Sequence, residues 1–188
     1  DLFVVDEPTI NQLMRNAKQL VAVQCGDTRS KPLREFDALL KVADRQEQRA
    51  DAMQVAIRKQ FQIALLREPS EDEIQRFVAL METNIKDAGP AIGVRSTLAA
   101  ILMLPEAIYR FELGRGEPDE HGRVMLQDQE LVLDINAAFS YIAPDEKLKQ
   151  ALEGGRLRTR EDVKLEVIRI LNDDSIRKPV ILRFFREY

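Results

Sequence analysis

The sequence predicts an all-α protein of about eight or nine helices, arranged as one multi-helix bundle or as two helical subdomains. Apolar residues recur at steps of three and four along nearly the whole chain, which is the spacing of one face of a helix. Strict alternation of apolar and polar residues, the pattern of a half-buried strand, is almost absent. The chain has 188 residues, of which 45% are hydrophobic and 32% charged, so it is long enough to bury a core and does not have a disordered composition.

The first part of the chain contains a series of stretches with helical spacing. The first spans residues 10–21 and is stopped by the polar segment CGDTRSKP, and the second spans 33–43. The polar stretch DRQEQRAD that follows is either a break or a solvated bridge to a third helix over 53–64. In the first helix, the residues expected to face the core are Ile10, Leu13, Ala17, Leu20 and Val21.

Residues 67–80, REPSEDEIQRFVAL, predict the start of a helix. Ser70 stands three positions before Glu73, the spacing of a capping box in which each side chain binds the backbone N–H of the other residue. Pro69 ends the preceding helix, and Glu71 and Asp72 favour the positive end of the new helix dipole. A continuous apolar stripe follows at Ile74, Phe77, Val78, Met81 and Ile85. A further helix is expected over 94–102, and Pro105 opens or kinks the short segment after it.

The segment GRGEPDEHGR is the clearest linker, with three glycines, a proline and five charged residues in ten positions. We therefore expect an N-terminal helical module over 1–113, a linker over 114–123 and a C-terminal helical module over 124–188. The last residues continue a helical pattern without a stop signal and the first residue is not methionine, so we expect the C-terminal module to be truncated and the chain to be a segment of a longer protein.

The C-terminal module contains four candidate helices. Asp128 is expected to cap one that carries Leu131, Ile135, Ala138, Phe139 and Ile142, and PDEKLKQALEGG reads as a short helix. Thr159 is expected to cap the next, which carries Val163, Val167, Ile170 and Leu171 on its inner face. Ser175 begins the last one, whose expected core residues are Val180, Ile181, Phe184 and Phe185.

Charge and hydropathy limit the class of partner. The net charge of −4 and a pI near 5.3 argue against a general nucleic-acid surface, which is normally basic. The apolar runs are short and interrupted by charge, so none approaches the roughly 20 residues of a membrane span. The basic cluster over 177–186 is interleaved with aromatic residues at helical spacing. A protein-contact or salt-bridged surface is favoured there over nucleic-acid binding.

No catalytic, cofactor-binding or metal-binding residue is predicted within the chain. The single histidine, His121, lies beside Asp119 and Glu120 in the glycine-rich segment, where a solvated linker explains it better than a metal site. The acidic pairs 71/73, 145/146 and 173/174 lie where helix starts and turns favour acids, so capping is the preferred interpretation. The single cysteine, Cys25, is interpreted as a small buried apolar group, and pairing with a cysteine outside the chain is the alternative.

Four ordered blocks together carry a resemblance to a known family. They are FQIALLREPSEDEIQRFVALME, LAAILMLPEAIYRFELG, LQDQELVLDINAAFSYIAPDEKLKQALEGGRL and VIRILNDDSIRKPVILRFFREY, and they cover residues 54–188 approximately. They resemble the large exported multidomain proteins of unknown function that are expanded in planctomycetes, in which an R-x-P-S/T-x-x-E helix start precedes a P-x-x-x-Y-R-x-E segment. The chain departs from that pattern between Tyr141 and Pro144, where it lacks an aromatic-rich insertion, and it has no tryptophan.

The resemblance implies an interior helical module of a periplasmic or cell-surface protein. Members of the family often carry a cytochrome-c-like domain elsewhere, so haem c is implied in missing domains and no cofactor in this chain. The function expected is a non-catalytic scaffold or interaction module, with other domains of the same polypeptide or a protein partner as its partners. The alternative is part of a redox or degradative enzyme whose active site is completed by absent domains, with carboxylates such as Asp145 and Glu146 contributing.

Overall fold

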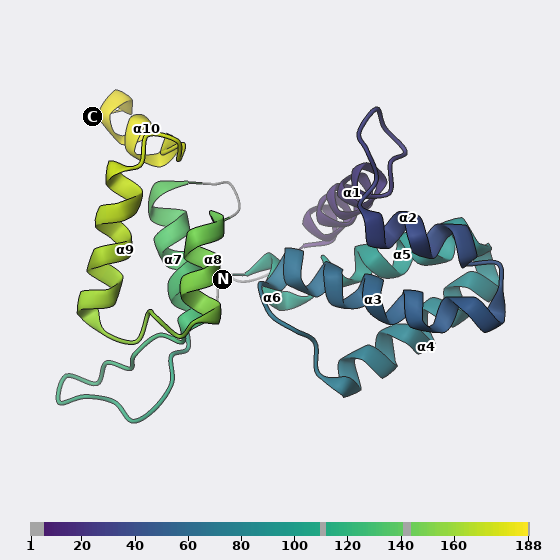
Figure 1. Cartoon of the computed structure of the whole chain (residues 1–188), viewed down its shortest axis with the longest axis horizontal. Helices are drawn as coiled ribbons and strands as arrows, with labels where there is room; N and C mark the ends of the chain where they lie inside the picture. The colour runs from purple at the N-terminus through teal and green to yellow at the C-terminus, as the bar shows by residue number, and fades with distance from the viewer. Residues whose placement is uncertain (1–5, 110–111, 141–143, 188) are drawn as a thin grey trace. The chain divides into compact units, whose positions relative to one another are not determined.

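The computed structural model describes residues 6–109, 112–140 and 144–187, and within these ranges it is all-α (Figure 1). The predicted fold class is confirmed. Arg115 and Met125 form an isolated antiparallel β-bridge. The helices are α1 (Glu7–Gln24), α2 (Arg34–Val42), α3 (Gln46–Leu65), α4 (Glu71–Ala88), α5 (Pro90–Ile101), α6 (Pro105–Ile108), α7 (Asp128–Phe139), α8 (Glu146–Glu153), α9 (Arg160–Asn172) and α10 (Pro179–Glu187).

The chain forms two compact units, Asp1–Tyr109 and Arg110–Tyr188. The segment 114–123, which the sequence marks as a linker, lies in the second unit. Near its start, the Arg115 N–H donates a hydrogen bond to the Met125 carbonyl at 2.7 Å. None of the helices in the described ranges is both long and apolar enough to cross a bilayer.

The first unit is built around α3, α4 and α5. Among its helices, α2 and α4 each pack against α3, and α1 and α4 pack against α5 (Figure 1). The polar stretch after α2 contains a short break, since α2 ends at Val42 and α3 begins at Gln46, and the remainder of the stretch forms the first turns of α3. The fully buried side chains include Phe36, Leu39, Met53, Ile57, Phe61, Met81, Leu98 and Ile101.

A glycine allows α4 and α5 to pack with their backbones very close together. Gly89 ends α4 and precedes α5 with a φ of 84°, so the chain reverses within one residue. On α5, a Cβ atom at Gly93 would lie 2.4 Å from the backbone nitrogen of Ile85 on α4. Only a residue without a side chain fits this contact.

The second unit has a smaller core. Its buried apolar side chains come from α7, α8, α9 and the loop between α8 and α9, and they are Val132, Ile135, Leu148, Ala151, Leu157 and Ile170. The Glu130 carboxylate of α7 is also buried and accepts from the backbone N–H groups of Leu113, Gly114 and Gln127 at 2.8 to 3.0 Å. This carboxylate therefore ties the start of the loop to the start of α7.

Several residues expected in the core are exposed. In α1, Ala17 and Val21 are buried as expected, but Ile10 and Leu20 are exposed because α1 packs against α5 along a narrow strip. Ala138 and Leu171 are also exposed. Phe184 and Phe185 are exposed, and α10 buries no residue. Ile142 lies outside the described residues.

Candidate interaction surface

The residues around His121 form a polar turn. One carboxylate oxygen of Asp119 accepts from the backbone N–H groups of His121 and Arg123, both at 2.9 Å, and the other accepts from the Arg123 guanidinium at 2.8 Å. These hydrogen bonds with Arg123 and His121 lower the pKa of Asp119. Within the described residues, no group of three His, Cys, Asp or Glu side chains is arranged to hold a metal ion.

The carboxylates named in the enzyme alternative are engaged in local structure. One oxygen of Asp145 caps α8 by accepting from the N–H groups of Lys147 and Leu148, and the other accepts from the Arg169 guanidinium at 2.9 Å. Glu146 is exposed in the first turn of α8 and pairs with Lys149. The two carboxyl groups thus have capping and ion-pair roles.

The strongest electrostatic cluster lies in the REPSEDE segment. The capping box is present, since the Ser70 hydroxyl accepts from the Glu73 N–H at 3.2 Å and the Glu73 carboxylate accepts from the Ser70 N–H at 2.8 Å. The Arg67 guanidinium also donates to both oxygens of Glu73 and to both oxygens of Glu106 in α6, at 2.8 to 3.0 Å. We name Arg67, Glu73 and Glu106 the arginine latch.

The latch connects the α3–α4 turn to α6. The turn begins at Leu66, which ends α3 in the left-handed conformation with a φ of 54°. The Arg67 guanidinium lies 5.2 Å from the centre of the Phe61 ring, so it also contacts the core. The hydrogen bonds from Arg67, together with the Ser70 N–H, lower the pKa of Glu73 to about 2. All of these partners belong to the protein itself, so the latch has a structural role.

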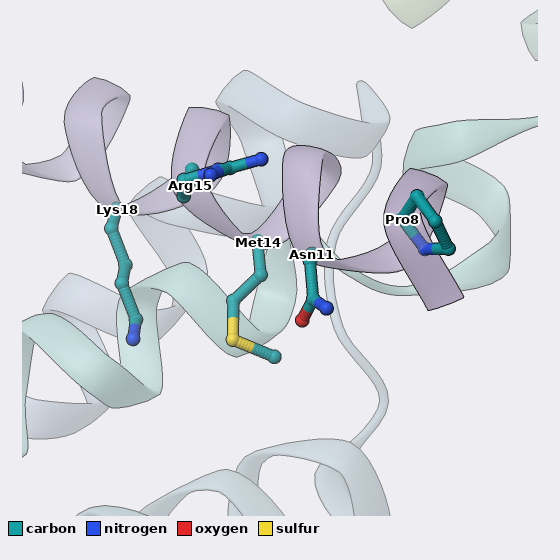
Figure 2. A pocket seen from close by; sticks show the side chains of 5 residues that line it. All are labelled: Pro8, Asn11, Met14, Arg15 and Lys18. Atoms are coloured by element: carbon teal, nitrogen blue, oxygen red, sulfur yellow. The ribbon is translucent and has the colours of Figure 1, made fainter. Parts of the chain in front are cut away.

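A hollow of about 360 Å³ lies against α1 (Figure 2). Figure 2 shows that the Met14 and Lys18 side chains extend in the same direction from the helix. The lining residues are Pro8, Asn11, Met14, Arg15 and Lys18. Because all five come from one exposed helix face, the hollow is a surface depression without converging polar groups, and it indicates no chemistry.

The exposed apolar residues of α10 are the clearest candidate for a functional surface. Leu182, Phe184 and Phe185 are 58%, 57% and 77% exposed. The two phenyl rings contact each other edge to face, with 5.5 Å between their centroids. We name these three residues the α10 face. An exposed apolar cluster of this kind is typical of a binding surface rather than of chemistry.

The α10 face is the exposed apolar part of an amphipathic helix. Val180 and Ile181, at the start of α10, are half-buried, and α10 packs against α7. Leu182, Phe184 and Phe185, which follow them in the same helix, are exposed. Arg183 and Glu187 lie on the other side and form an ion pair at 2.7 Å. The sequence signal for this surface was the apolar spacing itself, which cannot tell a core-facing stripe from a partner-facing one.

Another hollow, of about 340 Å³, lies in the second unit, which also contains α10. Its walls are formed by α7, the residue that caps α8, the end of α9 and the loop that leads into α10. The lining residues are Ile135, Asn136, Phe139, Ser140, Asp145, Ile170, Ser175, Ile176 and Arg177. Four of the nine are large apolar residues, and Arg177 is an exposed cation immediately before α10.

Comparisons with protein-family models, with curated proteins and with solved structures found no match.

Proposed function

We propose that this chain is a non-catalytic helical scaffold or interaction module. The observation that carries the proposal is the α10 face, in which Leu182 and two adjacent phenylalanines are exposed on a nine-residue helix that buries no residue. Leaving large apolar side chains in water is unfavourable, by roughly 1.5 to 3 kcal/mol for each one that a partner would bury. Such a surface is therefore expected to be covered when the protein works.

The polar groups with the most marked electrostatics are engaged in local structure, which supports an interaction role. The cluster with the largest pKa shift, the arginine latch, is satisfied by its own members and by the Ser70 backbone. Asp145 is likewise occupied by the α8 cap and by Arg169. A catalytic carboxylate instead needs a partner group across a cleft and room for substrate.

Cross-linking of the full-length protein in its own cells, with the linked peptides identified by mass spectrometry, tests the proposal. We expect reproducible links from residues 144–187 to one defined segment of another domain or another protein. Links that stay within residues 1–188 under all conditions, together with turnover of a substrate by the isolated chain, would contradict an interaction role.

We further propose that the module belongs to a larger exported protein with a cytochrome-c-like domain. The support for this step is the resemblance carried by the four sequence blocks. The coding sequence on both sides of this segment tests it. A signal peptide and a C-x-x-C-H motif are expected in the same polypeptide, and their absence would overturn the export and haem parts without affecting the interaction role.

A further inference from the structure

Residues 175–187, which contain the α10 face, carry a positive charge, although Asp173 and Asp174 directly precede them and the protein as a whole is acidic. Residues 175–187 contain four basic residues and one acidic residue, a net charge of +3, whereas the whole chain has a net charge of −4. Complementary charge across an interface favours the correct partner and speeds its association. The charge of this segment therefore points to an acidic partner.

Two of the four cations are available to a partner. The Lys178 ammonium donates to the carbonyls of Asp173 and Ile176 and so holds the turn between α9 and α10. Arg183 pairs with Glu187. Arg177 and Arg186 are exposed, and within the described ranges neither forms an ion pair. These two guanidiniums lie before the start and near the end of α10, on either side of the apolar residues along the chain.

The 340 Å³ hollow favours a protein as the partner over a lipid surface. Ile135, Phe139 and Ile176 give it apolar walls, and Arg177 contributes to its rim. Binding energy at protein interfaces is concentrated where a large side chain enters such a pocket, surrounded by polar groups that exclude water. A membrane surface presents no side chain that could fill a concave site.

We propose that the α10 face, with Arg177 and Arg186, docks an acidic amphipathic helix of a protein partner. The apolar side of that helix would cover Leu182, Phe184 and Phe185, one of its large apolar side chains would enter the hollow, and its carboxylates would meet the two free guanidiniums. This inference rests on the proposed interaction role and names the surface and the partner chemistry.

The probe is a fluorescently labelled synthetic helix with Leu and Phe at steps of three and four and Glu on its flanks. A matched peptide carries Lys in place of every Glu. Binding to the 188-residue chain is followed by fluorescence anisotropy at low and at high salt. We expect the acidic peptide to bind at least about tenfold more tightly than the basic one at low salt, with the difference reduced at high salt by charge screening.

Two pairs of substitutions locate the binding surface. F184S/F185S is expected to weaken binding of the acidic peptide by about tenfold or more at both salt concentrations, because it removes apolar contact. R177E/R186E is expected to weaken binding of the same peptide by about fivefold at low salt and much less at high salt. The matched controls are L20S/I92S, which removes two similarly exposed apolar residues of the first unit, and R29E/K31E, which reverses two exposed cations there.

The controls are expected to leave peptide affinity within about twofold of the wild type. None of the substituted residues is buried, so helix content by circular dichroism should stay unchanged in all four variants. A photoreactive residue at position 185 of the full-length protein in its own cells adds a test on the natural partner. We expect it to cross-link to a segment with a net negative charge, and the same group at position 92 to give no such product.

The inference is overturned by equal binding of the two peptides, or by tighter binding to phosphatidylglycerol vesicles than to the acidic peptide. It is also overturned by a dimer in sedimentation that F184S/F185S dissociates, since a second copy would then be the occupant. If F184S/F185S leaves the cellular cross-links of residues 144–187 intact, the assignment of the α10 face as the binding surface is wrong, while the interaction role stands. If those cross-links are absent in the wild type, the interaction role itself fails.

Discussion

At the scale of single residues, the arginine latch shows how one side chain can join three parts of a helical unit. Arg67 bonds Glu73 in the first turn of α4, Glu106 in α6 and the carbonyl of Glu68. The planar guanidinium suits this role because it offers donors in two directions at once, which a lysine ammonium does not do with the same geometry. The contact with Glu106 spans 39 positions of sequence.

Arg67→Ala is expected to destabilise the first unit by about 1 to 3 kcal/mol. The substitution leaves two carboxylates without their cation, and the latch is only partly exposed, so the loss should exceed that of a surface ion pair. Hydrogen exchange of the α3 and α4 amides measures the effect. Arg76→Ala, an exposed position on α4, is the control and is expected to change protection by less than about 0.5 kcal/mol.

Protonation of Glu73 should make the first unit less stable in acid. Its pKa is about 2 in the folded state, against an ordinary value of 4.5, so unfolding takes up a proton between these values. The stabilisation is fully present above about pH 5 and is lost as the pH falls toward 2. After solvent screening we expect it to amount to about 1 to 2 kcal/mol.

The matched comparison is Glu73→Gln against Glu71→Gln, because Glu71 is exposed in the same helix turn. Exchange protection of α4, measured at pH 7 and at pH 3, should depend less on pH in Glu73→Gln than in the wild type. Glu71→Gln should keep the wild-type dependence. An unchanged pH profile in Glu73→Gln would show that the latch does not set it.

At the scale of elements, local sequence accounts for some helix starts and not for others. The predicted cap of α7 at Asp128 is wrong, because Gln127 caps that helix, and the predicted start of the last helix at Ser175 is wrong, because α10 begins at Pro179. Ser70 and Thr159 each form the capping box or cap that their sequence spacing predicts, because a cap involves only residues within one turn. The distances between elements are less local. The close approach of α4 and α5 depends on Gly93, which in sequence is an unremarkable glycine inside a helix.

Gly93→Ala is expected to destabilise the first unit by about 2 to 3 kcal/mol. Alanine has the higher helix propensity, by about 1 kcal/mol, but its Cβ would lie against the backbone of α4 and force the two helices apart. Thermal unfolding followed by circular dichroism measures the change. Ile92→Ala, at an exposed neighbouring position of α5, should have little effect, and a stabilised Gly93→Ala would contradict the packing described.

At the scale of the whole molecule, the two units differ in how much apolar surface they bury. The core cluster of the first unit contains 17 buried residues, including Phe36 and Phe61. The buried apolar side chains of the second unit are fewer and contain no aromatic ring among the described residues. Since burial of apolar area is the main stabilising term in folding, the second unit should be the less stable of the two.

Native-state hydrogen exchange should therefore rank the helices. We expect the slowest exchange in α3 and α5, intermediate exchange in α7, and the fastest in α10, which buries no residue. Mass spectrometry of the 188-residue chain at pH 7 gives this order directly. Equal protection of α7 and α3 would show that the smaller core is compensated by other interactions.

The amino-acid sequence alone was enough to predict the all-α class, the caps at Ser70 and Thr159 and the capping role of the acidic pair at 145/146. These features depend on periodicity, on turn residues and on bonds between neighbours in the chain. Only the tertiary structure decided that Arg67 reaches Glu106, that Gly93 sits against Ile85 and that Phe184 and Phe185 are exposed. An apolar stripe specifies that a helix face must be covered, but what covers it depends on residues distant in sequence. In α10, which packs against α7, Val180 and Ile181 are half-buried while Leu182, Phe184 and Phe185 are exposed.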